Sequence, residues 1–427
     1  MTSGVPARVA LVNLGCRVNR VETDLIASKL EAAGCELVPQ SEADLVIINT
    51  CAVTGEAQTK TRKAVRHAAR LPQAPVVLAT GCVANLFEEE LRGVAPQLLV
   101  EKDKNLVAVR ALDALGIGED YVDDRGVLAV SPTPTGRTRP GIKIQDGCDN
   151  RCSFCIVWKA RGASTSLASS QVLDALREAQ RRHAHEVVLT GINLGSYRAP
   201  EGDALQEGAR LPDLIEYLLR ESSIERLRLS SIEPPDVTDE LLRVMAGSDG
   251  RVAPFLHVCL QSGCDETLRR MRRVYDTMYF ADMVRRCRNA LPSMAIETDL
   301  IVGFPGETDA EFETSYEFCR RMRFSRMHVF RYSKRPGTPA AVAPGQVAPP
   351  VSAHRSALMR ALAHDMRQEQ LEARVGSQDD VLVQWPGRAV NPELFDVLVD
   401  PRIPVGDLVH VRYARADDDV LVADLGQ

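Results

Sequence analysis

The segment QDGCDNRCSFC, residues 145–155, brings Cys148, Cys152 and Cys155 onto one short stretch as C-x3-C-x2-C. Three thiols on one loop would oxidise readily, so the spacing indicates a metal site. Structural zinc usually has four protein ligands, and no fourth cysteine or histidine lies nearby. An iron–sulfur cubane held by three cysteines keeps one iron that has no protein ligand and can chelate a substrate. We therefore expect a catalytic 4Fe–4S cluster here.

Three further cysteines, Cys16, Cys51 and Cys82, each follow an apolar strand, in NLGC, INTC and ATGC. A buried cysteine that only packs in the core could fall anywhere along a strand. In an open α/β sheet, the carboxyl ends of the strands open onto a crevice where ligands bind. The shared position therefore predicts a second site with three thiolates, and three separate core thiols are the alternative.

The other five cysteines have no spacing that suggests a ligand set. We expect them to be small buried or half-buried residues: Cys35, Cys259, Cys264, Cys287 and Cys319. The eight histidines are scattered along the chain. His257 lies inside an expected strand, and we expect a core histidine there with its hydrogen bonds satisfied.

The elements that would position these residues follow an α/β pattern. Strands and helices alternate over the first ~130 residues, which predicts an open parallel sheet. Six more strand–helix units suit a partial (β/α)6 barrel, and a helix over residues 351–374 precedes short strands typical of a small antiparallel β-barrel. The expected divisions are an N-terminal α/β domain at 1–130, a Pro-rich linker at 131–141, the partial barrel at 142–366 and the small barrel at 367–427.

The bulk composition fits a globular chain of several domains. The 427 residues are 45% hydrophobic and 26% charged, and no apolar stretch reaches the ~20 residues that span a bilayer. Eleven cysteines in such a chain favour metal binding or catalysis over a disulfide framework. No secretory signal is visible, so we expect a cytoplasmic monomer that has no membrane partner. With a net charge of −6, nucleic acid would need a local basic patch.

The C-x3-C-x2-C motif after the first strand of a partial barrel resembles the radical S-adenosylmethionine (SAM) enzymes. In that family the open iron binds SAM, and reductive cleavage of SAM gives a 5′-deoxyadenosyl radical. The strings LTGINLGSY, LSSIEP, LQSG and DLIVGFPGE resemble the family's binding loops. The resemblance makes five residues candidates to contact SAM or its surroundings: Asn193, Ser231, Glu233, Gln261 and Asp299. The alternative is that each is a polar strand-end residue that satisfies its own loop.

With both three-cysteine sites, the whole chain resembles the methylthiotransferases, including their C-terminal TRAM barrel. LGCRVNRVETDL and NTCAVTGEAQTKTRKAVR are most similar to the branch that modifies threonylcarbamoyladenosine beside the tRNA anticodon. The resemblance implies two 4Fe–4S clusters, SAM, an electron donor of flavodoxin or ferredoxin type, the tRNA anticodon stem-loop as partner, and methylthiolation at adenine carbon 2. Isopentenyladenosine in tRNA and a ribosomal-protein aspartate are the alternative substrates. A non-enzymatic iron–sulfur electron carrier with an RNA-binding tail is a remote alternative.

Some positions depart from the family pattern. Trp158 and Arg331 stand where the family usually has proline. Cys259 and Cys264, in HVCLQSGCDE, stand where proline and serine are usual. The change at Trp158 puts the loop over the expected cluster in doubt.

A tRNA enzyme needs cations that face phosphates. Residues 320–335 hold seven basic residues and no acidic one, and four of them are our candidates for RNA binding: Arg320, Arg321, Arg323 and Arg326. TLRRMRRVYD adds Arg269, Arg270, Arg272 and Arg273. The alternative is an ordinary solvated helix face. From Asp379 onward ten acidic residues outnumber four arginines, which puts the RNA role of the small barrel in doubt.

Overall fold

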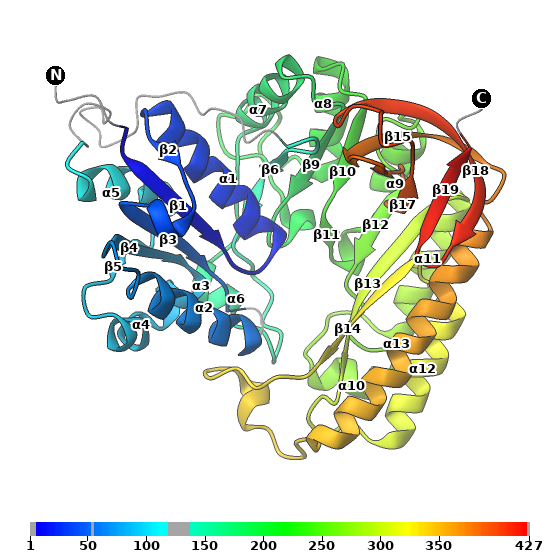
Figure 1. The fold of residues 1–427 in the computed structure, drawn as a ribbon. Helices are drawn as coiled ribbons and strands as arrows, with labels where there is room; N and C mark the ends of the chain where they lie inside the picture. Colours follow the sequence, from blue (N-terminus) through cyan, green and yellow to red (C-terminus); the bar gives the residue numbers. More distant parts are fainter. Residues whose placement is uncertain (1–5, 53–54, 118–136, 425–427) are drawn as a thin grey trace. The chain divides into compact units, whose positions relative to one another are not determined.

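The structure is a computed structural model that describes residues 6–52, 55–117 and 137–424 (Figure 1). It divides into two compact units, which we describe separately. Unit 1 comprises Met1–Arg137, Gly147–Asp149 and Cys155–Ala163, and unit 2 comprises Thr138–Asp146, Asn150–Phe154 and Ser164–Gln427. Of the expected linker at 131–141, residues 131–136 lie outside the described residues, and the domain boundaries stay predictions.

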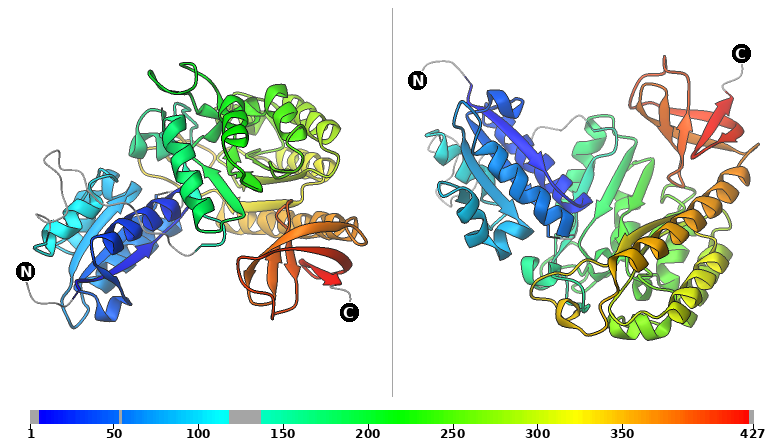
Figure 2. Two further views of the ribbon diagram at one scale, coloured as in Figure 1. Left: turned by 90° about the horizontal axis from the view of Figure 1, so that it is seen from above. Right: turned by 60° about the horizontal axis from the view of Figure 1, so that its bottom comes forward.

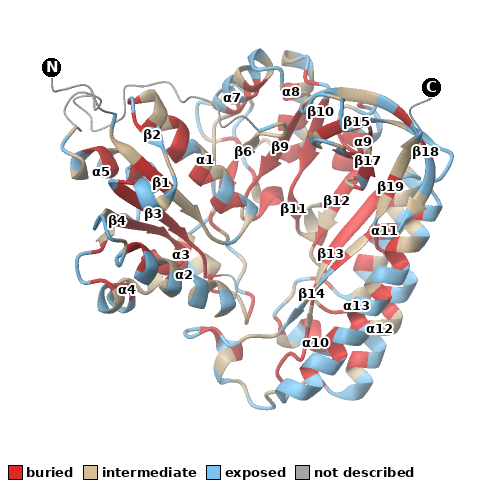
Figure 3. Ribbon diagram, in the orientation of Figure 1, coloured by how far each residue is buried: buried red, intermediate tan, exposed pale blue. Residues whose placement is uncertain are grey.

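Unit 1 is built on a five-stranded parallel sheet in the order β2-β1-β3-β4-β5. The strands are β1 (Arg8–Asn13), β2 (Glu36–Leu37), β3 (Leu45–Thr50), β4 (Val76–Gly81) and β5 (Leu99–Val100). All six residues of β3 are buried, as expected for an apolar strand covered on both faces (Figure 3). The two-residue edge strands β2 and β5 were not predicted, because they are too short to show a pattern.

Helices cover both faces of this sheet. Apolar residues of α1 (Arg17–Ala32) and α5 (Val107–Ala114) pack on one face. Those of α2 (Gly55–Ala68), α3 (Cys82–Leu86) and α4 (Glu88–Val94) pack on the other. Ile156 and Ala160, at and within the short helix α6 (Val157–Arg161), join this second core. The arrangement confirms the predicted open α/β domain.

The first part of unit 2 carries parallel strands in two sheets, ordered β10-β9-β6 and β11-β12-β13-β14. The strands are β6 (Gly141–Lys143), β9 (Glu186–Thr190), β10 (Arg226–Leu229), β11 (Ser231–Ile232), β12 (Phe255–Val258), β13 (Ala295–Val302) and β14 (Arg326–Arg331), with the small pair β7 (Gln145–Asp146) and β8 (Thr165–Ser166) beside them. One expected strand is interrupted at Ser230, which separates β10 from β11. The predicted partial barrel is confirmed.

The helices between these strands are amphipathic and bury one face in a single large core. They are α7 (Ser169–Arg181), α8 (Leu211–Glu221), α9 (Asp239–Ala246), α10 (Asp265–Arg270), α11 (Thr277–Ala290) and α12 (Asp309–Met322). Leu256, Ile296 and Leu300 face this core. Because strand residues alternate between faces, polar His257, Glu297 and Asp299 lie on the opposite, inner side of the sheet.

The long helix α13 (Pro349–Glu372) leads into the C-terminal barrel (Figure 2). This closed barrel has the order β15-β16-β17-β19-β18. Its strands are β15 (Gln378–Trp385), β16 (Arg388–Val390), β17 (Asp396–Leu398), β18 (Leu408–Asp417) and β19 (Val420–Asp424). The barrel was predicted as antiparallel, and every pair is antiparallel except β17 with β19, which runs parallel.

A buried ion pair ties the central strands to this barrel. Glu186 on β9 and Arg228 on β10 are both fully buried and lie 2.6 Å apart. Arg228 also donates hydrogen bonds to the backbone carbonyls of Asn391 and Pro392, 3.2 and 2.8 Å away. No helix within the described residues is long and apolar enough to cross a bilayer.

Candidate active site

The strands β1, β3 and β4 are neighbours in the sheet of unit 1, and each is followed by a cysteine. Cys16 is the N-cap of α1, Cys51 follows β3, and Cys82 opens α3. Because the strands are parallel and adjacent, their carboxyl ends share one edge of the sheet. The structure thus brings the three predicted residues to the same edge.

The loop at Gly15 shows how tightly this edge is packed. Gly15 has φ +101°, and a Cβ there would lie 2.3 Å from the Sγ of Cys51. Only glycine both adopts this backbone conformation readily and leaves room for the thiol. Burial raises the pKa of the Cys16 thiol; Arg161 lowers that pKa, and the nearby Cys82 raises it further.

A hydrogen-bond network, missed by sequence reasoning, holds the three loops together. The Asn19 side-chain amide donates to the carbonyls of Leu14 and Thr50, at 2.8 and 2.9 Å. The Thr50 hydroxyl donates to the carbonyl of Thr80 and accepts from the N–H of Ala84, at 2.7 and 3.1 Å. These contacts fix the ends of β1, β3 and β4 relative to one another.

Buried cations lie behind the same edge. Arg161 forms an ion pair with Glu22 at 2.7 Å and donates to Asn19 Oδ1 at 2.8 Å. Lys104 lies 3.2 Å from Glu22 and 2.5 Å from Asn49 Oδ1. All three charged side chains are largely buried. Two cations around one carboxylate leave excess positive charge, which suits the negative charge that thiolate ligands bring.

The donor set at this edge consists of three cysteine thiols, one from the end of each of three neighbouring strands. Structural zinc usually has four protein ligands, whereas three cysteines can hold an iron–sulfur cubane that keeps one iron open. The residue types present therefore suit a 4Fe–4S cluster.

The division between the units runs through the C-x3-C-x2-C motif: Cys148 and Cys155 belong to unit 1, and Cys152 belongs to unit 2. In unit 1, the N–H of Val157 donates to Cys155 Sγ at 3.4 Å. In unit 2, Arg273 donates to Cys152 Sγ at 3.0 Å. Hydrogen bonds to sulfur stabilise thiolates and tune the potential of a cluster they hold. Each of these donors would stabilise the thiolate of the cysteine that it contacts, Cys155 or Cys152.

Arg273 is a site residue that sequence reasoning placed wrongly. We predicted it as part of an RNA-binding surface, but its side chain is only 3% exposed. It forms an ion pair with Glu233 besides its contact with Cys152. Burial works to lower the pKa of Arg273, but the charges of Glu233 and Tyr275 outweigh it and hold that pKa well above its usual value. Arg270 also has an acidic partner, Glu311, at 2.6 Å.

Four of the five candidate SAM contacts lie at or near strand ends of unit 2, and Asp299 lies within β13. Asn193 is buried, its side-chain N–H donates to Ser196, and its Oδ1 has no hydrogen-bond partner among the described residues. The backbone of Gln261, at φ +68°, is hydrogen-bonded to β13. Ser231 Oγ lies 3.4 Å from His257 Nδ1.

The remaining candidates, Glu233 and Asp299, face charged or sulfur-bearing neighbours. Burial raises the pKa of Glu233 although Arg273 opposes it. Asp299 faces His257 and Cys259. Burial, with the charges of Asp299 and Glu233, raises the pKa of the Cys259 thiol well above its usual value.

Gly147, next to Cys148, offers a sharp test of the motif. At φ +72°, a Cβ there would lie 1.9 Å from the backbone carbonyl oxygen of Ala163, which has no freedom to move aside. We expect Gly147→Ala to displace Cys148 and to lose the iron bound at this motif, about four atoms per chain. Iron analysis of anaerobically purified protein measures the loss.

Gly162→Ala is the matched control for that substitution. Gly162 has a similar φ of +77°, but a Cβ there meets no atom within 4 Å. Alanine at this positive φ carries a backbone penalty of about 1–3 kcal/mol, but the substitution makes no collision. Equal iron loss in both variants would show that backbone strain, and not the close contact beside Cys148, is responsible.

The arginines expected to bind RNA are partly neutralised. Arg320 donates to Glu317 at 3.0 Å, and Arg323 lies 3.3 Å from Glu369. Arg326 lies 3.6 Å from Glu297 and 3.5 Å from Asp396. Arg321 stacks over Phe318 and has its guanidinium 5.8 Å from the ring centre.

Comparison with known proteins identifies the family. Residues 142–319 match the radical SAM superfamily, and residues 8–100 match uncharacterized protein family UPF0004. The threonylcarbamoyladenosine tRNA methylthiotransferase MtaB of Bacillus subtilis is 36% identical, over 85% of this chain and 82% of the relative. A tRNA-2-methylthio-N(6)-dimethylallyladenosine synthase of Acidothermus cellulolyticus is 34% identical, over 98% and 88%. The ribosomal protein uS12 methylthiotransferase RimO of Desulforudis audaxviator is 34% identical, over 88% and 85%.

A solved structure shares the fold. The radical SAM methyltransferase TsrM of Kitasatospora setae aligns with a TM-score of 0.56 at 17% identity, covering 79% of this chain and 77% of that one. Membership of the radical SAM superfamily implies a 4Fe–4S cluster and SAM as cofactors. The matched residues and the similarity over most of the chain confirm the expected family and its enzymatic character. The chain belongs to the radical SAM methylthiotransferase family.

Proposed function

We propose that this enzyme methylthiolates carbon 2 of threonylcarbamoyladenosine beside the anticodon of tRNA. The main support for this proposal is that Cys16, Cys51 and Cys82 lie at one sheet edge, in a chain that also has the radical SAM motif. For the substrate, support comes from the strings around Cys16 and Cys51 and from the MtaB relative at 36% identity. Relatives named for the two other substrates are 34% identical, so overall identity separates the three only narrowly.

In this proposal the two cysteine sites have different roles. The cluster held by Cys148, Cys152 and Cys155 would supply reductive cleavage of SAM. The cluster held by Cys16, Cys51 and Cys82 would supply the sulfur, which a second SAM molecule methylates. Arg273 and the N–H of Val157 stabilise and orient the thiolates of Cys152 and Cys155. An electron donor of flavodoxin or ferredoxin type would serve the first site.

The protein's other contribution is the shape and polarity of the SAM pocket. Asn193, Ser231, Glu233 and Gln261 are the proposed contacts. The unpaired, buried Asn193 Oδ1 supports this role, because a buried acceptor without a donor costs stability unless a ligand satisfies it. Glu233 is held in place by Arg273, which also bonds Cys152. One arginine thus couples a cluster ligand to a proposed SAM contact.

Nucleoside analysis of tRNA tests the substrate directly. We expect mass spectrometry of tRNA from a deletion strain to show loss of the methylthio group from threonylcarbamoyladenosine, while methylthio-isopentenyladenosine and the ribosomal-protein aspartate modification persist. Loss of either of the other two modifications instead would contradict the assignment. If all three persist, the proposed function fails.

The arginine surface on α12 gives a second prediction. Replacing Arg320, Arg321 and Arg323 by Glu is expected to weaken tRNA binding and to flatten its dependence on salt, because each lost phosphate contact removes counterion release. Binding titrations between 50 and 200 mM salt measure both effects. The matched control replaces three arginines in and directly after helix α7 by Glu: Arg177, Arg181 and Arg182. Equal weakening in both variants would show that only net charge matters.

A further inference from the structure

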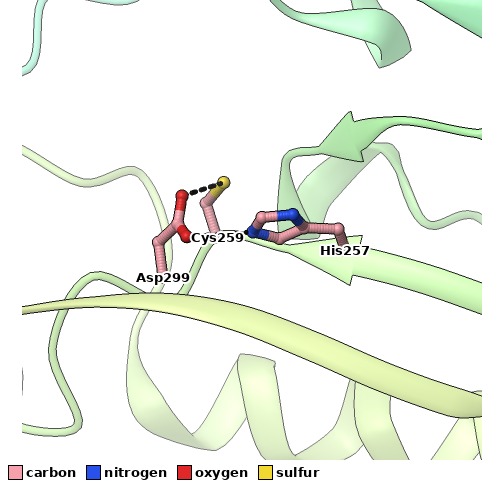
Figure 4. A group of neighbouring side chains, drawn as sticks. All are labelled: His257, Cys259 and Asp299. Atoms are coloured by element: carbon pink, nitrogen blue, oxygen red, sulfur yellow. Dashed lines mark hydrogen bonds and ion pairs between the residues drawn. The ribbon is translucent and has the colours of Figure 1, made fainter. Parts of the chain in front are cut away.

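Three side chains of different metal-binding types meet on the inner side of the central sheet (Figure 4). His257 lies on β12, Cys259 directly follows that strand, and Asp299 lies on β13. Residues two apart on a strand share a face, and β12 pairs in parallel with β13 so that His257 is opposite Glu297. Two residues further on, Cys259 and Asp299 therefore reach the same place.

The separations of the ligand atoms match those around a single ion. His257 Nε2 lies 3.2 Å from Asp299 Oδ1, and Cys259 Sγ lies 3.9 Å from Asp299 Oδ2. All three ligand atoms lie within 4.8 Å of one another. Around one tetrahedral zinc ion, with bonds of 2.0–2.3 Å, neighbouring ligand atoms stand about 3.3–3.8 Å apart. The site needs only small shifts to hold a metal.

His257 is not the satisfied core histidine that the sequence predicted. Its Nε2 is buried and lies 3.2 Å from Asp299 Oδ1, but the two atoms do not form a hydrogen bond. A metal ion bound to both atoms would satisfy this buried nitrogen. At its other nitrogen, Nδ1 lies 3.4 Å from Ser231 Oγ. Such a contact at one nitrogen orients the ring so that the other can bind a metal.

We propose that His257, Cys259 and Asp299 bind one divalent transition-metal ion, with zinc as the best match. A thiolate disfavours Mg²⁺ and Ca²⁺, which prefer oxygen, whereas a mixed set of nitrogen, sulfur and oxygen suits zinc. Three protein ligands leave the fourth position to water or another ligand, the arrangement typical of catalytic zinc. In this proposal Asp299 is a metal ligand and not a SAM contact.

The site shares no residue with either cysteine triad and does not rest on the proposed function. It depends on Cys259, one of the five cysteines outside the two triads. Further polar groups surround it: the ring of His328 on β14 lies 5.7 Å from that of His257, and Glu297 lies 3.9 Å from His328. They supply hydrogen-bond partners for a bound water.

Metal analysis of the full chain tests the proposal. Protein purified anaerobically and equilibrated with Zn²⁺ is expected to hold about one zinc besides its iron. Cys259→Ala and Cys259→Pro should lower zinc affinity by at least about 100-fold. Loss of a residue that only hydrogen-bonds to a metal ligand lowers affinity about 10–100-fold, and loss of the ligand itself should cost more. Their iron content should not change, which also shows that they fold. Cys264→Ser, which changes a buried cysteine five residues along the chain that is not in this group, is the control and should retain the zinc.

Two results would overturn the site. One is zinc bound equally by wild type and Cys259→Ala; the other is wild type that takes up no zinc. X-ray absorption at the zinc edge adds a direct check. We expect one sulfur at about 2.3 Å with nitrogen and oxygen at about 2.0–2.2 Å. A shell of three or four sulfurs would place the ion in a cysteine triad and contradict the proposal.

Discussion

Cys51→Ala is expected to abolish methylthio product while leaving reductive cleavage of SAM intact. Cys51 directly follows β3, lies against Gly15 and shares its sheet edge with Cys16 and Cys82. Loss of one of only three ligands should empty this site, so iron should fall from about eight to about four atoms per chain. Product analysis, 5′-deoxyadenosine formation and iron content measure the three effects.

Cys35→Ala is the matched control for this prediction. Cys35 is also a buried cysteine of unit 1, but it packs in the core on the opposite face of the sheet from Cys82. Its loss should leave iron and product unchanged. Methylthio product from Cys51→Ala, or loss of SAM cleavage together with product, would contradict the separate roles of the two sites.

Arg228→Met is expected to have the largest effect on stability, about 3–5 kcal/mol, because it leaves the carboxylate of Glu186 buried without its main partner. Burial would raise the pKa of Glu186, but Arg228, with Arg139 and Arg226, lowers it from 4.5 to about 2. The pair therefore stabilises fully above pH 4.5, and this contribution is lost as the pH falls through about 2. Arg228 also bonds two carbonyls that lead into β17, so the barrel should loosen too.

Calorimetry at neutral pH measures this effect as a fall in Tm of about 10 °C. Arg220→Met is the control: Arg220 pairs with Glu221 on the exposed side of α8, where an ion pair contributes less than about 1 kcal/mol. The double variant Glu186→Gln, Arg228→Met should recover part of the loss, because the buried carboxylate is then neutral; the recovery is incomplete because Arg226 also loses its ion pair with Glu186. A single variant as stable as the control would show that Arg228 is dispensable.

Much of the fold, and the shared sheet edge of Cys16, Cys51 and Cys82, could be predicted from the sequence. The hydrophobic pattern of β1, β3 and β4 makes them neighbouring parallel strands, and parallel strands end at the same edge. The position of Cys16, Cys51 and Cys82 therefore follows from local sequence and chain connectivity alone. The sequence does not predict the short edge strands or the break between β10 and β11, because these segments are too short to show a hydrophobic periodicity.

Only the tertiary structure decided which side chains surround the cysteines. Arg161 meets Glu22 across 139 residues of chain, and Arg273 meets Cys152 across 121. Charge runs in the sequence do not distinguish such buried arginines from solvated ones, and Arg273 was misplaced for this reason. His257, Cys259 and Asp299 likewise meet only through the register of β12 and β13. Local pattern determines strands and their ends; contacts between distant side chains depend on how the whole chain packs.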